Sequence, residues 1–568
     1  MIETTDRDPG RAGATASAPV DVVGRHKRLV LRTAMISTLT LTSRLIGFAR
    51  ESLSASMFGH ESPVNDAFVT AWRVPNLFRS MLGEGAISTS LQTAITRADA
   101  EQGEEAGRRL FLAISRVVGW LLLGLCGTMM LAVWLMPDAM PISGFAWLGR
   151  HPELVRELTL RMMPFVVLVC LSAVCSGALS VRGHFLSPNL APVLMNVWWI
   201  AALFIVAHEF GWSRLPGTDD AAEYARQVGM ARWLAGMVLV AGGILLLAQV
   251  PALLAKNLLV VPRRAASGRP AAVPAREILA VLKTSAPLAL GAAVYQVNVM
   301  VDGLMAVALL EKDGGASLLY YATRVQQFPM SLVSIAATSA VFPALTALGH
   351  RRALQDLRTL HDRTHYAIAF VAIPASAGLL AFAEPVIAVC FQHGAFGAEG
   401  VSRAAAGLRC LTLAILPAGA AGLVARTYYA MGDFRTPVRI SIAMLLANVV
   451  LNFTFVAIFG MDIDGLAFAT ALTAWGNLLL LLPGLRKRLG LPPAEQGFVA
   501  RILRMGAAAV PSVLAARFVH AVAAPAAHPA TALLGCIALA IGLYAALSHV
   551  LEVPEWRHVL DRVRRLGR

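Results

Sequence analysis

The sequence predicts an all-α polytopic membrane protein with about fourteen transmembrane helices, arranged as two pseudo-symmetric six-helix lobes followed by two C-terminal helices. Of its 568 residues, 57% are hydrophobic and only 15% are charged, whereas soluble proteins carry about 25% charged residues. Apolar stretches of at least ~18 residues recur along the whole chain, as membrane-spanning helices require. Two short motifs also recur at nearly the same offset, which indicates an internal repeat.

Length and apolarity place the candidate spans near 30–57, 66–95, 109–136, 158–181, 189–209, 228–255, 277–309, 317–348, 363–391, 402–430, 436–460, 464–485, 500–521 and 530–551. The first residues are polar and lack an apolar core followed by a cleavage site, so they predict a disordered cytoplasmic tail. The expected division is a tail (1–27), a first lobe (28–256), a basic cytoplasmic linker (257–275), a second lobe (276–487), two further spans (488–552) and a basic cytoplasmic tail (553–568).

Basic residues mark every second loop. They lie at Arg25, Lys27, Arg28, Arg108, Arg109, Lys256, Arg263, Arg264, Arg269, Arg351, Arg352, Arg358, Arg486, Lys487, Arg488 and in the C-terminal tail. The intervening loops are poor in basic residues, so the positive-inside rule predicts an inner-membrane protein with both termini in the cytoplasm. Membrane topology and contact with anionic lipids therefore explain the net charge of +15, and no nucleic-acid partner is expected.

The internal repeat is carried by two motifs. Ala71-Trp72-Arg73-Val74 recurs as Ala322-Thr323-Arg324-Val325, and Gly183-His184-Phe185-Leu186-Ser187-Pro188 recurs as Gly432-Asp433-Phe434-Arg435-Thr436-Pro437. Both copies of each motif fall on the same expected side of the membrane, so the repeat is parallel. Such halves commonly enclose a central site and rock about it.

The first two expected spans contain many ionisable and small polar residues for membrane segments. The candidate substrate-binding residues are Ser43, Arg44, Arg50, Asp66, Arg73, Asn76, Arg79, Glu84 and Gly85, with Arg324 at the position equivalent to Arg73 in the second lobe. An ion in hydrocarbon costs several kcal/mol and needs a partner or a wet cavity. Because arginines outnumber acids here and suit phosphate or carboxylate, the pattern predicts a cavity for an anionic substrate. The alternative is that the arginines pair with nearby acids or snorkel from helix ends.

A second polar set is expected in the second lobe. Asp302 lies inside the seventh span, Asn448 and Asn452 are one turn apart on the eleventh, and Thr470 lies on the twelfth. These residues offer oxygen ligands for a hard monovalent cation, and no other cofactor is expected. The competing interpretation is interhelical hydrogen bonding, which is common for Asn and Thr in membrane bundles.

Several segments are similar to the MurJ/MviN family of lipid II flippases, in the MOP superfamily. The similarity lies in Thr42-Ser43-Arg44-Leu45-Ile46-Gly47-Phe48-Ala49-Arg50-Glu51, Phe58-Gly59, Asp66-Ala67-Phe68, Arg73-Val74-Pro75-Asn76-Leu77-Phe78-Arg79, Gly83-Glu84-Gly85-Ala86, Tyr320-Tyr321-Ala322-Thr323-Arg324, Phe328-Pro329 and Gly432-Asp433-Phe434-Arg435-Thr436-Pro437. The resemblance extends from about residue 30 to 555. Ser80, Thr323 and Asn452 depart from the residues common in relatives.

The resemblance implies a transporter, not an enzyme, that moves undecaprenyl-diphosphate-linked disaccharide-pentapeptide from the cytoplasmic to the periplasmic leaflet by alternating access. It places Arg44, Arg50, Arg79 and Arg324 at the diphosphate, a prenyl-tail groove on the last two helices, and Asp302, Asn448, Asn452 and Thr470 near the sodium site of some members. The alternatives are a flippase for another undecaprenyl-diphosphate-linked glycan and a MATE-type exporter. The sequence leaves open whether cell-wall synthases are partners.

Overall fold

The computed structural model describes residues 22–83, 86–136, 151–212, 219–260, 273–331, 336–490, 496–523 and 528–566, and all regular secondary structure in these ranges is helical. The first helix, α1 (Val22–Phe58), begins within the expected tail at 1–27, and the bounds of that tail stay a prediction. The rest of that tail lies outside the described residues. The same holds for residues 261–272 of the linker.

The first lobe contains bent spans. After α1 follow α2 (Pro63–Phe78), the π-helical turn η1 (Arg79–Gly83), α3 (Ala86–Gln102), α4 (Glu104–Leu135), α5 (Pro152–Met162), α6 (Phe165–Val181), α7 (Leu186–Phe210), α8 (Asp220–Leu247) and α9 (Val250–Ala255). The expected span 66–95 is thus divided by the π-helical turn η1. Pro75, inside α2, also removes one backbone hydrogen bond to the turn before it. The expected span 158–181 is divided in the same way at Pro164, between α5 and α6.

The second lobe repeats this plan. It contains α10 (Ala275–Leu309), α11 (Gly315–Met330), α12 (Ala336–His350), α13 (Leu354–Phe391), α14 (Ala398–Thr412), α15 (Ile415–Ala430), α16 (Arg435–Phe453), the π-helical turn η3 (Thr454–Ile458) and α17 (Ile463–Arg488). The chain ends with α18 (Gln496–Ala523), α19 (Pro529–Val550) and α20 (Pro554–Leu566). Helix α13 is kinked at Phe382, just before Pro385, because a proline ring crowds the preceding turn.

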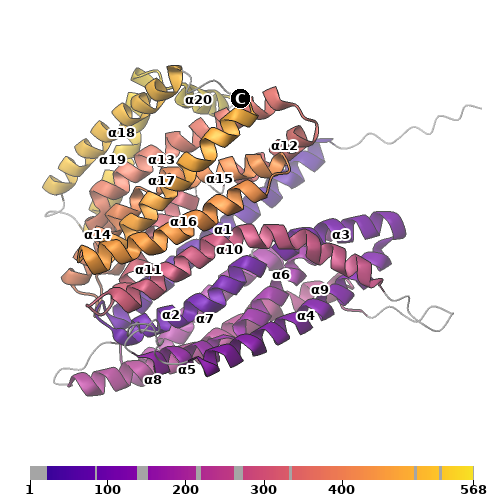
Figure 1. Ribbon diagram of the computed structural model, residues 1–568, viewed down its shortest axis with the longest axis horizontal. Coiled ribbons are helices and arrows are strands. Elements are labelled where there is room, and N and C mark those ends of the chain that lie inside the picture. The colour runs from indigo at the N-terminus through magenta and orange to yellow at the C-terminus, as the bar shows by residue number, and fades with distance from the viewer. Residues whose placement is uncertain are drawn as a thin grey trace, which may run out of the picture.

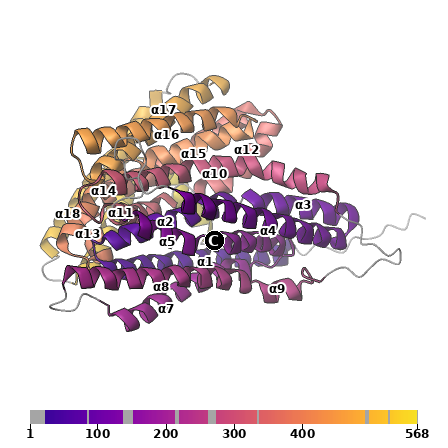
Figure 2. The ribbon, with the colours of Figure 1, turned by 60° about the horizontal axis from the view of Figure 1, so that its bottom comes forward.

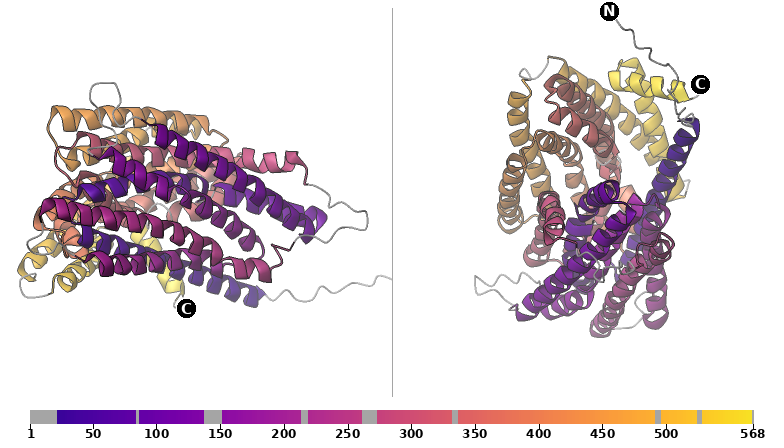
Figure 3. Two further views of the ribbon diagram at one scale, coloured as in Figure 1. Left: turned by 90° about the horizontal axis from the view of Figure 1, so that it is seen from below. Right: turned by 90° about the vertical axis from the view of Figure 1, so that its right-hand side faces the viewer.

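The two lobes lie side by side with their helices roughly parallel (Figure 1). Helix α10 packs against α2 and α3 of the first lobe and against α11 and α16 of the second, so it lies between them (Figure 2). Helices α18 and α19 pack on each other and on α13, at the outer side of the second lobe (Figure 3). Helices α2, α10 and α11 therefore meet at the interface between the two lobes.

The turns of the second repeated motif have the same geometry in both lobes. Gly183, between α6 and α7, and Gly432, between α15 and α16, both have positive φ, at 70° and 83°. In the second lobe Asp433 accepts hydrogen bonds from the amides of Arg435 and Thr436, both at 3.0 Å. His184 holds the equivalent position and accepts from the Ser187 amide at 3.4 Å. His184 and Asp433 thus both accept hydrogen bonds from amides in the first turns of equivalent helices, α7 and α16.

Nine helices in the described ranges are long and apolar enough to cross a membrane, or ten if the bent pair α14–α15 forms one span. Exposed side chains such as Trp120 (72%) and Trp134 (64%) on α4 are large and apolar, as lipid contact requires. Helix α1 and the short helices α2, α3, α11 and α12 are not among the nine. The count of fourteen spans therefore stays a prediction.

Candidate functional site

A cluster of charged side chains from α1 and α11 lies at the interface between the lobes. Arg50 and Glu51 are adjacent on α1 and both buried, and Arg50 Nη2 donates to Glu51 Oε1. The Tyr320 hydroxyl on α11 donates to the same Glu51 oxygen at 2.9 Å and accepts from Arg324 Nη2 at 2.9 Å. Arg324 Nε lies 4.0 Å from Glu51 Oε1. One carboxylate is therefore shared by two arginines, one from each lobe.

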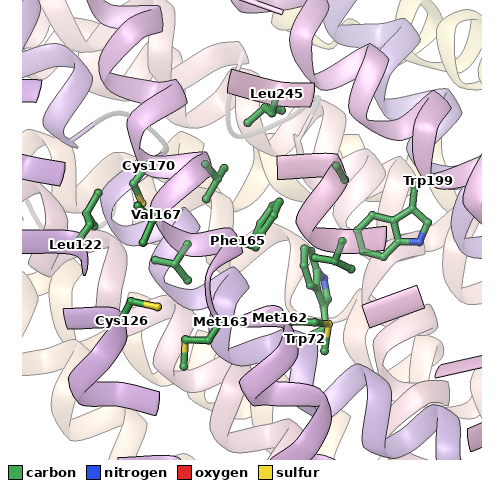
Figure 4. Close-up of a cluster of buried hydrophobic side chains, with 14 of the residues drawn as sticks. Trp72, Leu122, Cys126, Met162, Met163, Phe165, Val167, Cys170, Trp199 and Leu245 are labelled. Carbon is green, nitrogen blue, oxygen red and sulfur yellow. The ribbon is translucent and has the colours of Figure 1, made fainter. Parts of the chain in front are cut away.

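Arg50 is held from its other side by α7. Arg50 Nη1 donates to Asn196 Oδ1 at 3.2 Å, and its guanidinium lies 4.4 Å from the ring centre of Trp199. Trp199 packs edge-on against Trp72, at 5.1 Å between ring centres, and Trp72 contacts Phe165 at 5.3 Å (Figure 4). The Trp199 ring, itself packed by Trp72, therefore gives the guanidinium a cation–π partner and restricts its position.

A small crevice, with room for about one water molecule, opens beside this cluster. Its lining combines the charged pair with aromatic and small polar side chains: Arg50, Glu51, Ser54, Phe58, Asn65, Phe68, Val69, Trp72, Trp199, Leu234, Tyr320 and Tyr321. The crevice thus combines the hydrogen-bond donors of Arg50 and Tyr320 with apolar side chains in one lining. An anion that reached this crevice could replace Glu51 as the acceptor for both arginines.

Ser43 and Arg44 extend the site along α1. Asn196 Nδ2 donates to the Ser43 carbonyl at 3.0 Å and to its hydroxyl at 3.2 Å, so Asn196 joins Ser43 to Arg50. Arg44 is exposed and donates to the Ser331 hydroxyl, directly after α11. Ser43, Arg44 and Arg50 on α1 and Arg324 on α11 therefore lie where the first lobe meets the second. Their place in a shared substrate cavity stays a prediction.

Arg73 has a different environment. Its guanidinium is buried and donates to the carbonyls of Val299 at 2.7 Å and Ala316 at 3.2 Å, on α10 and α11. A side chain at Gly303 would overlap this guanidinium, so glycine there makes room for it. Arg73 thus joins α2 to the second lobe through backbone groups. Its expected contact with substrate stays a prediction.

Asp66 also contacts backbone of the second lobe. Its two carboxylate oxygens accept from the amides of Gly314 at 2.9 Å and Ser317 at 2.8 Å, at the start of α11. Gly314 itself has φ +83° and no side chain to cap the helix, so α2 supplies the cap. Nearby, Asn65 Nδ2 donates to the Tyr321 hydroxyl at 3.1 Å. These hydrogen bonds therefore join the start of α2 in the first lobe to α11 in the second.

The remaining residues of the predicted set lie further along the second span. Arg79 Nε donates to Asn76 Oδ1 at 3.0 Å, across the junction of α2 and η1. Both side chains are half-buried. Glu84 and Gly85 lie outside the described residues. The site of Arg50 and the pair of Arg79 and Asn76 are thus two separate positions on the expected path.

The second polar set does come together, from α10, α16 and α17. Asp302 accepts from Asn452 Nδ2 at 2.8 Å and from the Thr470 hydroxyl at 2.9 Å. Asn452 Nδ2 also donates to Asn448 Oδ1 at 3.0 Å. All but Thr470 are fully buried, and Asn452 Oδ1 has no hydrogen-bond partner among the described residues. An orphaned oxygen beside a carboxylate, a hydroxyl and a second amide fits the donor set of a hard cation.

Three contributors to the site were not singled out from the sequence. Asn196 and Trp199 are three residues apart on α7 and face Arg50, and Tyr320 is one turn before Arg324 on α11. The spacing of Tyr320 and Arg324 by four residues was a usable signal, because such side chains meet on one helix face. A polar residue in the apolar run of α7 was the only signal for Asn196.

The sequence matches one known family over most of its length. The family model of "Lipid II flippase MurJ" matches residues 54–549. A "Lipid II flippase MurJ" from Burkholderia cenocepacia is 30% identical over 486 residues, which cover 84% of this chain and 87% of that protein.

Two solved structures show the same fold. One is "Lipid II flippase MurJ, inward closed conformation", with a TM-score of 0.68, 20% identity and coverage of 93% of this chain and all of that chain (100%). The other is an inward-facing multidrug resistance MATE family transporter of the MOP superfamily, with a TM-score of 0.63, 15% identity and coverage of 81% of this chain and 98% of that one.

Proposed function

Since this chain belongs to the lipid II flippase MurJ family, we propose that it moves lipid II from the cytoplasmic to the periplasmic leaflet by alternating access. Lipid II is a disaccharide-pentapeptide carried on undecaprenyl diphosphate. The observation that carries the proposal is the cluster of Arg50, Glu51, Tyr320 and Arg324, which gives each lobe one arginine at a shared anion position. No covalent bond changes in this cycle.

The charge arrangement supports a specific sequence of steps. The diphosphate enters from the cytoplasmic side while the prenyl tail stays in lipid beside α18 and α19. It then competes with Glu51 for Arg50 and Arg324, because bidentate arginine contacts suit phosphate oxygens. An anion bound to both arginines draws α1 and α11 together. The free energy of that contact favours closure of the entry side and rocking of the lobes.

The proposed setting is the inner membrane, with both termini in the cytoplasm. The alternation of basic and charge-poor loops supports this orientation. It places the turns at 59–62, 310–314 and 392–397 on the periplasmic side. Cell-wall synthases, which consume lipid II, are the protein partners that fit this proposal.

Two rival functions use the same fold. A flippase for another undecaprenyl-diphosphate-linked glycan would keep the arginine pair and change the surroundings of the sugar and peptide. A MATE-type exporter of cationic drugs would favour an acidic crevice, whereas two arginines share one carboxylate here. The arginine pair therefore favours an anionic substrate over a cationic drug.

The test of function is complementation in a bacterium depleted of its own lipid II flippase, combined with flipping of fluorescent lipid II in proteoliposomes. We expect the wild-type chain to restore growth and to make lipid II accessible on the opposite face. A well-expressed chain that fails with lipid II but moves another undecaprenyl-diphosphate glycan would establish the first rival. Movement of a cationic drug alone would establish the second.

We further propose that Asp302, Asn448, Asn452 and Thr470 hold a Na⁺ ion. Their oxygens come from three helices of the second lobe, and the orphaned Asn452 oxygen would gain a partner. The ion would place a positive charge directly at the buried Asp302 carboxylate. Its binding would tie α10 to α16 and α17.

Replacing Asp302 with asparagine is expected to abolish sodium binding, because it removes the only carboxylate of the set and keeps its shape. Purified wild-type protein should gain thermal stability in NaCl relative to choline chloride. The Asp302→Asn variant should have the same melting temperature in both salts. Asp464→Asn, a carboxylate in the first turn of α17, is the matched control and should keep the sodium response. Equal stabilisation of wild type and Asp302→Asn by sodium would contradict the assignment.

A further inference from the structure

The turn between α1 and α2 reaches across to the second lobe through one imidazole. The amide of Gly397, at the start of α14, donates to His60 Nδ1 at 3.1 Å. Side chains at Gly397 or Gly400 would crowd the His60 ring or its Cβ, and the Phe396 ring lies 5.9 Å away between centres. The ring is therefore seated in a recess that two glycines of the opposite lobe leave open.

This contact requires a neutral imidazole. A backbone N–H can only donate, so Nδ1 of His60 carries no proton, and the neutral ring has its proton on Nε2. That nitrogen faces Glu61, with Nε2 and Oε1 4.0 Å apart. His60, Glu61 and Glu399 bring their ligand atoms within 4.8 Å of one another. Because the protonated Nε2 offers no lone pair, this geometry does not suit a metal ion.

Protonation would convert the contact into a repulsive one. The imidazolium would point an N–H at the amide of Gly397 and place a positive charge at the N-terminal end of α14, where the helix dipole disfavours cations. The carboxylates nearby are exposed, and Glu399 is engaged by Lys312 at 3.3 Å. Arg403, further along α14, is paired with Asp462 at 2.6 Å. The exposed carboxylates therefore compensate only weakly.

We propose that His60 is a proton-operated latch: protonation releases the α1–α2 turn from α14 and favours opening of the lobes at this end. Among the described residues, few other backbone hydrogen bonds join the end of α1 to the loop before α14. One of them runs from the Ala395 amide to the Ser56 carbonyl, at 2.9 Å. The proposal rests on the proposed topology, in which this turn is periplasmic. Acid in the periplasm then favours the outward-open state, so the opening of the lobes depends on the periplasmic pH.

The latch is tested by distance measurement, without lipid II. Spin labels at Ala221→Cys on α8 and Ala457→Cys on η3, both exposed positions, report on the separation of the lobes in nanodiscs, with native cysteines replaced. Between about pH 7.5 and pH 5.5, where imidazoles change charge, the open fraction of wild type should rise roughly fivefold, as loss of one hydrogen bond implies. His60→Asn, with an uncharged acceptor, should remove this rise. His60→Lys should be open at both pH values.

The control is His393→Asn, an exposed histidine of the same loop region that bonds only within its own lobe, to the Val389 carbonyl at 3.2 Å. It should keep the wild-type response. The proposal fails if wild type does not respond, if His60→Asn responds like wild type, or if acid closes the lobes. The last result, if abolished by Glu399→Gln, would mean that an ion pair with Glu399 dominates. Because no substrate is used, these outcomes are independent of whether the protein flips lipid II.

Discussion

Replacing Arg50 with alanine is expected to weaken lipid II binding roughly 10- to 100-fold, as loss of charge-assisted hydrogen bonds worth about 1.5–3 kcal/mol implies. Arg50 is fixed by Glu51, Asn196 and the face of Trp199, so its guanidinium is preorganised for an anion. Arg50→Lys should lose most of the affinity too, because an ammonium cannot make bidentate contacts. The measurement is binding of lipid II to purified protein, beside complementation.

The control for Arg50 is Arg232→Ala, which removes an exposed arginine paired with Glu157 at 2.9 Å. This variant should bind and complement like wild type, because exposed ion pairs contribute about 0–1 kcal/mol. Arg324→Ala should resemble Arg50→Ala, since both share the Glu51 position. If folded Arg50→Ala and Arg324→Ala proteins bind lipid II normally, the arginines are structural and the site assignment is wrong.

Replacing Asp66 with alanine should strongly increase the fraction of protein in which the two lobes are apart at the N-terminal end of α11. The carboxylate accepts both the Gly314 and the Ser317 amides, and without it those buried donors lose their acceptor, at about 1–3 kcal/mol. Asp66 and α11 belong to different lobes, so their contact exists only when the lobes are together. Its loss therefore destabilises the closed state and leaves the open state unchanged. The labels at Ala221→Cys and Ala457→Cys should therefore report a larger open fraction at neutral pH.

The matched control is Asp433→Ala. Asp433 also caps a helix, by accepting from the Arg435 and Thr436 amides, but the helix is in its own lobe. Loss of this cap should lower the melting temperature, at about 0.5–2 kcal/mol, and leave the distance between the lobes unchanged. Equal distance changes in both variants would mean that Asp66 contributes only general stability.

Much of the fold was predictable because the membrane imposes a simple rule. A chain that must satisfy every backbone group in hydrocarbon forms helices, and apolar length reveals them. Helices such as α10 and α19 begin and end within a few residues of their expected bounds. The breaks between α2 and α3 and between α5 and α6 were harder to place. A proline destabilises a continuous helix, but the packing of neighbouring helices decides whether the helix breaks, and the sequence does not show that packing.

The sequence by itself determined the fold class and the repeat, and it predicted an anion site from the arginines of the first two spans. Composition, apolar length and motif spacing are properties of the sequence, and they can be recognised without knowing how the helices pack. Only the tertiary structure decided what each charge contacts. Arg50 faces Asn196 and Trp199, whereas Arg73 and Asp66 bind backbone groups of α10 and α11. These partners lie about 150 to 250 positions away in the chain, so the packing of the two lobes selects them.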